Sequence, residues 1–181
     1  MLEDLPENVL TEKIIGCAIE VHRTYGGPGL KEFAYEVALE WELRQAGLTV
    51  ERQRPVPVVY KGHVFCADDE SPKRFDLKVS DANFTVIVEI KAVQAKAKDE
   101  AFRAQCRTYL KMLGLRVGLV INFGRPTVRE GIDRVVNETR EEYRQRLARE
   151  CPAALRNVIR EEDDPGEDAV PALANGYRAS R

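Results

Sequence analysis

The sequence lacks the features that would place the protein in a membrane or on a secretory route. No apolar run approaches the roughly 20 residues that a membrane-spanning helix needs. The first residues are acidic and carry no basic stretch followed by an apolar one, so we expect no signal peptide. These absences predict a cytoplasmic protein without a membrane partner.

Closely spaced zinc ligands are also missing. The cysteines are Cys17, Cys66, Cys106 and Cys151; they form no CxxC pair and are accompanied by only two histidines. A structural zinc site requires about four Cys or His ligands at short, regular spacing, so we expect none. In a reducing cytoplasm the cysteines are expected to be independent thiols.

An excess of positive charge is the third absence. The 28 Lys and Arg residues against 30 Asp and Glu residues give a formal net charge of −2, so no overall basic field points to a nucleic-acid partner. A local patch would have to provide such contacts. A row of Arg103, Arg107, Lys111 and Arg116, three of them at helical spacing, could follow a phosphate backbone or serve only as a solubilising surface.

What is present fits one folded domain with a tail. The 181 residues are 44% hydrophobic and 32% charged, which is typical of a soluble globular protein with a sizeable core. We expect a domain over residues 1–150 and a C-terminal extension over residues 151–181. From about residue 161 the extension combines clustered acids with two prolines, which predicts disorder. Such a tail could dock a protein partner or have no binding role.

The spacing of apolar residues predicts the elements of the domain. The expected helices cover about 11–25, 30–46, 99–113 and 128–149. The expected strands cover 48–53, 56–60, 63–65, 75–79, 84–91 and 117–123. The second helix should face the core with the stripe of Leu30, Phe33, Ala34, Val37, Ala38 and Trp41. This order of elements predicts an α/β domain with a mixed β-sheet flanked by helices.

The fourth and fifth predicted strands form a hairpin whose two faces differ. Alternation along each strand gives one face that is wholly apolar and must be buried: Phe75, Leu77, Val79, Phe84, Val86, Val88 and Ile90. Asp76, Glu89 and Lys91 fall on the other face. If the turn centres on Ala82 and Asn83, Asp76 lies directly opposite Glu89.

Two directly opposed carboxylates repel each other across a sheet, and a shared divalent cation would remove that conflict. Oxygen ligands that leave room for water and phosphate suit Mg²⁺ or Mn²⁺. Lys91 would then place an ammonium group beside the metal. The plainer alternative is that Glu89-x-Lys91 is a solvated strand face with a cross-strand salt bridge, which is the commoner use of such a pair.

The spacing of Asp76, Glu89 and Lys91 resembles the D…E-x-K pattern of the PD-(D/E)xK nuclease superfamily. More narrowly, Gly29-x-x-Glu32-x-x-Tyr35 resembles the motif that names the GxxExxY family within it. The resemblance extends over about residues 10–137. It includes the segments 20–23, 27–30, 58–62, 88–92 and 118–123.

The resemblance implies a restriction-endonuclease-like core and a set of site residues. Asp76 and Glu89 would be metal ligands, Lys91 the catalytic lysine, and Glu32 an acidic residue that the preceding helix offers to the site. Gln105 and Tyr109 are similar to a Q-x-x-x-Y motif that supports the site and contacts DNA in related nucleases.

Several candidates keep two interpretations. Spacing alone favours a solvated face for Glu32 and Glu36, one turn apart, and the resemblance changes this for Glu32 only. His22 and Tyr35 are weaker candidates for substrate contact, because His22 could simply favour its helix terminus. Tyr35 and Trp41 are better explained by packing than by stacking on bases. For Gln105 and Tyr109, a role in supporting the core and a role in the functional site are equally compatible with the sequence.

The resemblance implies a metal-dependent nuclease that uses Mg²⁺ (or Mn²⁺) and hydrolyses phosphodiester bonds of DNA with metal-activated water. The alternative is a non-catalytic module that keeps the fold and binds nucleic acid or a protein partner. The residues do not separate DNA from RNA or endonuclease from exonuclease action. They leave a homodimer open.

Overall fold

The computed structural model describes residues 7–56, 58–61, 63–66, 73–94, 99–139, 141–142, 145–146 and 149. The chain divides into two compact units, Met1–Thr139 and Arg140–Arg181, and every element named below lies in the first. The predicted boundary at residue 150 and the predicted disorder from about residue 161 lie outside the described residues.

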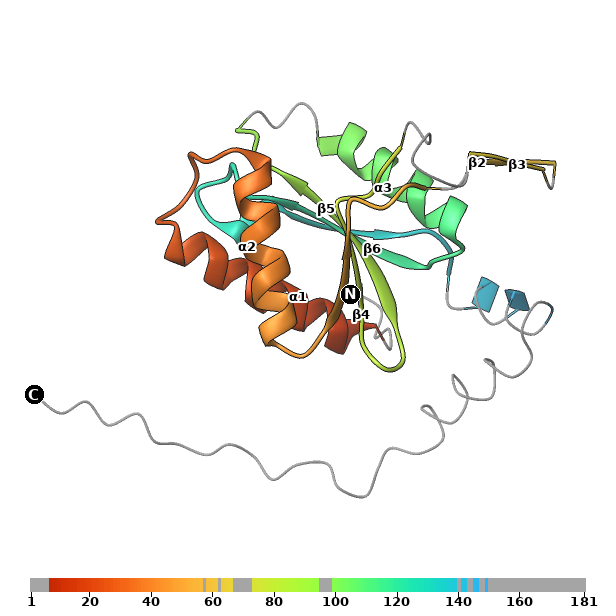
Figure 1. The fold of residues 1–181 in the computed structure, drawn as a ribbon, viewed down its shortest axis with the longest axis horizontal. Helices are drawn as coiled ribbons and strands as arrows, with labels where there is room; N and C mark the ends of the chain where they lie inside the picture. The colour runs from red at the N-terminus through yellow and green to blue at the C-terminus, as the bar shows by residue number, and fades with distance from the viewer. Residues whose placement is uncertain are drawn as a thin grey trace, which may run out of the picture. The chain divides into compact units, whose positions relative to one another are not determined.

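Three helices and a five-stranded sheet make up the first unit (Figure 1). The helices are α1 (Asn8–Thr24), α2 (Glu32–Gln45) and α3 (Asp99–Leu113), with a short 3₁₀ helix, η2 (Val128–Gly131). The strands of the sheet are β1 (Thr49–Arg52), β4 (Leu77–Ser80), β5 (Thr85–Lys91), β6 (Val117–Asn122) and β7 (Ile132–Val136). A separate hairpin pairs β2 (Val58–Tyr60) with β3 (His63–Cys66).

The sheet has the order β1-β4-β5-β6-β7. Strands β5 and β6 run parallel, which requires a crossover connection, and α3 provides it. The other neighbouring pairs in this sheet are antiparallel. The predicted mixed sheet flanked by helices is therefore confirmed, and its topology agrees with the restriction-endonuclease-like core.

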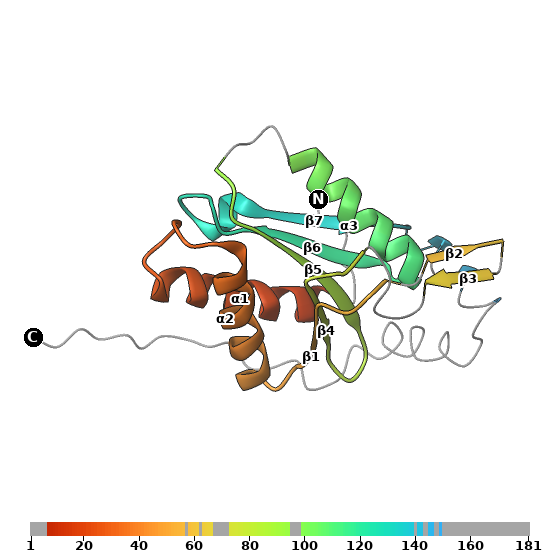
Figure 2. The same ribbon diagram turned by 45° about the horizontal axis from the view of Figure 1, so that its top comes forward.

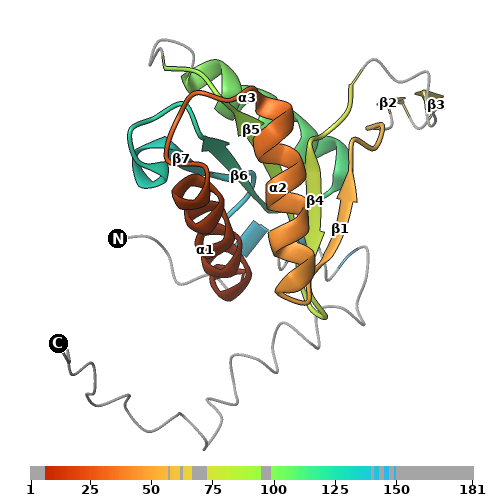
Figure 3. The same cartoon turned by 60° about the vertical axis from the view of Figure 1, so that its left-hand side comes forward.

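Both faces of the sheet are covered, as Figure 2 and Figure 3 show. The larger core lies between the sheet and α1 and α2, and a smaller core lies between the sheet and α3. A strand covered on both faces needs apolar side chains on both, which explains why all of β6 and the last six residues of β5 are buried. Within the described residues, no helix combines the length and the hydropathy needed to cross a membrane.

The predicted core stripe of α2 is wrong. Phe33, Val37 and Trp41 are 66%, 40% and 59% exposed, whereas Tyr35 and Leu39 are fully buried. Two apolar rows at the same helical spacing compete on this helix, and spacing cannot choose between them. Tyr35 decides the choice, because its ring stacks on Phe123 of the core at 4.5 Å between centroids.

The predicted last helix is also wrong over its first half. Residues 128–136 form η2 and the edge strand β7, which pairs antiparallel with β6. Val135 is buried against the α3 side of the sheet, and Asp133 binds Arg103 of α3 at 3.0 Å. Pairing with an open sheet edge thus outweighs the helical charge pattern.

Candidate functional site

The β4–β5 hairpin has the predicted register. Leu77 pairs with Val88 and Val79 pairs with Val86, so a turn at residues 82–83 is confirmed and the same register carries Asp76 to Glu89. Asp76 lies just before β4, and its Oδ2 accepts a hydrogen bond of 2.7 Å from the backbone N–H of Ile90.

The apolar face of the hairpin is buried as predicted, with one exception. Leu77, Val79, Val86, Val88 and Ile90 lie in the core beneath α1 and α2, and Phe84 packs partly against it. Phe75 instead packs on the α3 side. The backbone bends at Asp76, which interrupts the alternation before β4 begins.

Glu89 is the most confined charged group of the site. Its side chain is fully buried, Oε2 accepts a hydrogen bond of 3.3 Å from Lys91 Nζ, and Oε1 has no partner. Burial raises the pKa of Glu89 to about 8; the charge of Asp76 adds to this and that of Lys91 opposes it. An ionised carboxylate without a full set of partners is costly in the interior, so this position favours a proton or a cation.

Lys91 is buried between the two carboxylates. Its Nζ lies 3.3 Å from Glu89 Oε2, 3.8 Å from Asp76 Oδ2 and 5.5 Å from the ring centroid of Phe102. Burial alone would lower the pKa of Lys91, but the negative charges of Glu89, Asp76 and Glu32 raise it above its ordinary value. Lys91 is therefore a cationic donor at neutral pH.

A third carboxylate comes from α2, as expected. Glu32 begins this helix, and its Oε1 accepts a 3.4 Å hydrogen bond from the backbone N–H of Ala92, directly after β5. Its charge acts on Lys91. Glu32 therefore lies at the same end of the sheet as Asp76 and Glu89.

Glu36 does not lie on a solvated face, contrary to the prediction. It is buried, and its Oε1 accepts a hydrogen bond of 2.9 Å from Gln53 Nε2 and lies 3.4 Å from Arg52 Nη1. Burial raises the pKa of Glu36, and the charge of Asp76 raises it further against the opposing effects of Gln53 and Arg52. Gln53 Nε2 also lies 3.2 Å from Asp76 Oδ1. Sequence reasoning missed both residues; the only signal was that Glu36 follows Glu32 by one turn.

Gln105 and Tyr109 approach the site from α3. Gln105 Nε2 donates a hydrogen bond of 2.9 Å to the hydroxyl of Tyr109, whose ring is buried. Burial raises the pKa of Tyr109, and the charges of Glu89 and Asp76 add to the shift. Tyr109 therefore lies within electrostatic range of both carboxylates. Tyr109 is in the core, and Gln105 is half-buried at its edge.

Tyr35 holds the loop before α2, whereas the His22 side chain contacts the segment after β6. The Tyr35 hydroxyl donates to the carbonyl of Gly27 at 2.9 Å and accepts from the backbone N–H of Leu30 at 3.3 Å. His22 Nε2 lies 3.2 Å from the carbonyl oxygen of Arg125, and the same ring borders a cleft of about 410 Å³. The packing role expected for Tyr35 is confirmed; substrate contact by either residue stays a prediction.

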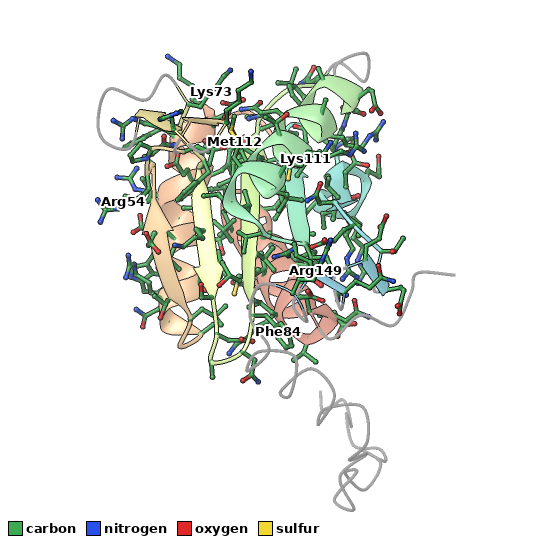
Figure 4. All side chains as sticks on the ribbon, turned by 90° about the vertical axis from the view of Figure 1, so that its right-hand side faces the viewer. Arg54, Lys73, Phe84, Lys111, Met112 and Arg149 are labelled. Atoms are coloured by element: carbon green, nitrogen blue, oxygen red, sulfur yellow. The ribbon has the colours of Figure 1, made fainter. Side chains whose placement is uncertain are left out.

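The predicted basic row is broken by ion pairs. Arg116 is buried against Glu7, and Arg103 binds Glu100 and Asp133. Lys111 projects from α3, as Figure 4 shows, and is exposed.

The donor set fits a hard divalent cation. Among the residues that the structure describes, no three His, Cys, Asp or Glu side chains gather closely enough to enclose a metal on their own. Mg²⁺ is typically held by one or two carboxylates and keeps several waters. Asp76 and the unpartnered Oε1 of Glu89 match that requirement, and a closed zinc site does not.

Comparison with known proteins agrees with this geometry. A family model described as the PD-(D/E)XK nuclease superfamily matches residues 8–135, a range that contains every candidate residue above. The solved structure of SSO0001 is similar over 84% of this chain and 96% of its own, with a TM-score of 0.41 and 14% sequence identity. No curated protein matches the sequence.

Proposed function

Because the chain belongs to the PD-(D/E)XK nuclease superfamily, we propose that it is a Mg²⁺-dependent nuclease that hydrolyses phosphodiester bonds of DNA. The observation that carries the proposal is Glu89. Among the described residues, its Oε1 is the one carboxylate oxygen that is buried without a partner, and the hairpin register places Glu89 opposite Asp76. A cation at this point would resolve both the repulsion and the missing contact.

In this proposal Asp76 and Glu89 hold the cation, and Glu32 contributes from the start of α2. When bound, the cation would supply a water of lowered pKa and positive charge that offsets the charge of the transition state. The water oxygen would form a bond to phosphorus while the bond from phosphorus to the leaving sugar oxygen breaks. The proton that the water loses would pass to solvent, and the leaving oxygen would take up a proton from solvent.

Lys91 acts as a donor in this reaction. In the metal-free site the negative charges around Lys91 raise its pKa, which favours the ammonium form. In this proposal the ammonium donates a hydrogen bond to the attacking water or to a phosphate oxygen. In this proposal Gln105 and Tyr109, which are hydrogen-bonded to each other on α3, support the same site.

We also propose membership of the narrower GxxExxY family. Three observations support this proposal. Gly29 has φ +141°, a conformation that favours glycine. Glu32 accepts a hydrogen bond from the residue after β5, and Tyr35 donates a hydrogen bond to the loop between α1 and α2. The motif therefore couples the loop to the site.

A cleavage assay tests the proposal. Linear duplex, circular duplex and single-stranded DNA, and RNA, are incubated with the protein in Mg²⁺, Mn²⁺ or EDTA. Asp76→Asn should abolish cutting. Asp81→Asn is the matched control, because Asp81 lies at the hairpin turn and accepts only local backbone hydrogen bonds.

Metal-dependent cutting of DNA that Asp76→Asn removes and Asp81→Asn leaves would support the nuclease. Cutting of RNA alone would replace the proposed substrate. No cutting of any substrate, together with no Mn²⁺ binding by calorimetry, would overturn the proposal and leave a non-catalytic binding module.

A further inference from the structure

Gln53 has an unusual backbone for a residue with a side chain. It follows β1 with φ +51°, and among the described residues Lys61 alone shares a positive φ without being glycine. This left-handed region is disfavoured once a Cβ is present. Strained residues of this kind persist only where the surroundings impose them.

The surroundings of Gln53 do impose its conformation. Its backbone N–H donates to the carbonyl of Asp76 at 3.0 Å. Its own carbonyl accepts a hydrogen bond of 2.8 Å from Arg74 Nη1. Both backbone polar groups of Gln53 are thus tied to the segment that enters β4.

The side-chain amide of Gln53 lies between two carboxylates. Its Nε2 is 3.2 Å from Asp76 Oδ1 and 2.9 Å from Glu36 Oε1. An amide NH₂ has two hydrogens, so one nitrogen serves both acceptors. The other oxygen of Asp76 accepts from the backbone N–H of Ile90. The Asp76 carboxylate is therefore held at both oxygens, once from β5 and once by Gln53.

We propose that Gln53 is a positioning residue of the metal site, which fixes the Asp76 carboxylate and anchors it to Glu36 on α2. This inference rests on the proposed function, because it assigns Asp76 the role of a ligand. A carboxylate oxygen that accepts one hydrogen bond retains further acceptor capacity, so Asp76 can be held by Gln53 and bind a cation at once. Hydrogen-bond partners of metal ligands are typically worth about 10–100-fold in metal affinity.

Because Gln53 has a left-handed backbone, a glycine substitution can separate the role of its side-chain amide from its role in the turn. If Gln53 served only to make the turn, glycine would do so better, because glycine adopts φ +51° without strain. Gln53→Gly relieves the backbone strain but also removes the donor to Glu36 and Asp76, so its melting temperature reports the balance of the two effects. Mn²⁺ affinity, measured on protein shown to be folded by far-UV circular dichroism, is the readout that a merely structural role would not lower. Lys61→Gly is the matched control, since it relieves the same backbone conformation in the β2–β3 hairpin.

The test is Mn²⁺ affinity by calorimetry, with melting temperature and kcat at saturating Mn²⁺ measured on the same samples. We expect folded Gln53→Gly to bind Mn²⁺ about 10–100-fold more weakly. Lys61→Gly should bind as the wild type does. Part of the cleavage lost in Gln53→Gly should return as Mn²⁺ is raised.

Wild-type affinity in Gln53→Gly would overturn the inference and leave the proposed function standing, provided that Asp76→Asn still loses the metal. A wild-type protein that binds no Mn²⁺ would overturn both.

Discussion

Two buried charged clusters lie at opposite ends of the parallel strands β5 and β6, and they are built differently. Before β6, Arg116 meets Glu7 through two parallel contacts, Nε to Oε1 and Nη2 to Oε2. After β5, a single ammonium, that of Lys91, faces Glu89 and Asp76 at 3.3 and 3.8 Å.

Glu7 pairs with Arg116 and fixes the start of α1 against the sheet. Its charge also acts on Arg134, a second cation nearby whose Nε and Nη2 are buried without a partner among the described residues. The second cluster carries more negative than positive charge and leaves Glu89 Oε1 unpartnered. The bidentate pair satisfies both oxygens of the Glu7 carboxylate, whereas the excess negative charge of the unbalanced cluster around Lys91 favours binding of a further cation. We therefore expect the Glu7–Arg116 pair to stabilise the fold and the charges around Lys91 to support catalysis.

The largest effect should come from the unbalanced cluster. Lys91→Ala removes the donor to water or phosphate and should lower kcat at saturating Mg²⁺ by about 10²–10³-fold. The far-UV circular dichroism spectrum should be unchanged. An activity within tenfold of the wild type would remove Lys91 from the reaction.

Breaking the Glu7–Arg116 pair should change the stability of the fold instead of the activity. Arg116→Met leaves Glu7 buried without its partner and should lower the free energy of unfolding by about 3–5 kcal/mol. Urea denaturation followed by circular dichroism measures this, and the activity per folded molecule should stay the same. Adding Glu7→Gln should restore part of the loss; a loss below about 1 kcal/mol in the single variant would contradict the comparison.

The free energy of unfolding of the metal-free protein should depend on pH because of Glu89 in the unbalanced cluster. Because burial raises the pKa of Glu89 from 4.5 to about 8, the folded state binds more protons than the unfolded state within that window. The contribution of Glu89 to stability is therefore complete below pH 4.5 and is lost as pH rises through about 8. Each unit of pKa corresponds to about 1.4 kcal/mol, so the loss should reach a few kcal/mol.

Urea midpoints measured in EDTA across this pH window provide the test. Glu89→Gln should flatten the dependence, since an amide does not titrate. A slope that survives Glu89→Gln would assign the effect to another group.

The smallest expected effect is stabilisation by the cation itself. For a dissociation constant near 1 mM, 10 mM Mg²⁺ adds about 1.4 kcal/mol to the free energy of unfolding, a rise of a few degrees in Tm. Arg116→Met should be less stable than the wild type but should gain the same stability from Mg²⁺. Asp76→Asn should gain none. An equal rise in both variants would mean that Mg²⁺ acts elsewhere.

The hairpin could be predicted from sequence because its signals are local. Strand alternation and a short turn fix which residues oppose each other, and both are legible without tertiary information. The register of β4 and β5 and the meeting of Asp76, Glu89 and Lys91 therefore follow from residues 75–91 alone. Phe75 departed from the pattern because the backbone bends beside it.

The other parts depend on distant partners. Glu36 is buried only because Gln53 and Arg52, sixteen or more residues away, supply donors. The choice between the two apolar rows of α2 depends on Phe123, and β7 depends on the open edge of β6. No local pattern contains these contacts, so spacing predicted a solvated glutamate, the wrong helix face and a helix in place of a strand.

The exposed row of α2 has a practical consequence for spectroscopy. Trp41 is the only tryptophan of the chain and is 59% exposed. Its indole is already hydrated in the native state, so its emission maximum should shift little when the chain unfolds. It should also be accessible to a collisional quencher such as iodide before any denaturant is added. Tryptophan fluorescence of this protein thus reports on the outer surface of α2, and a ligand or partner that covers this helix would be seen as a blue shift and as protection from quenching.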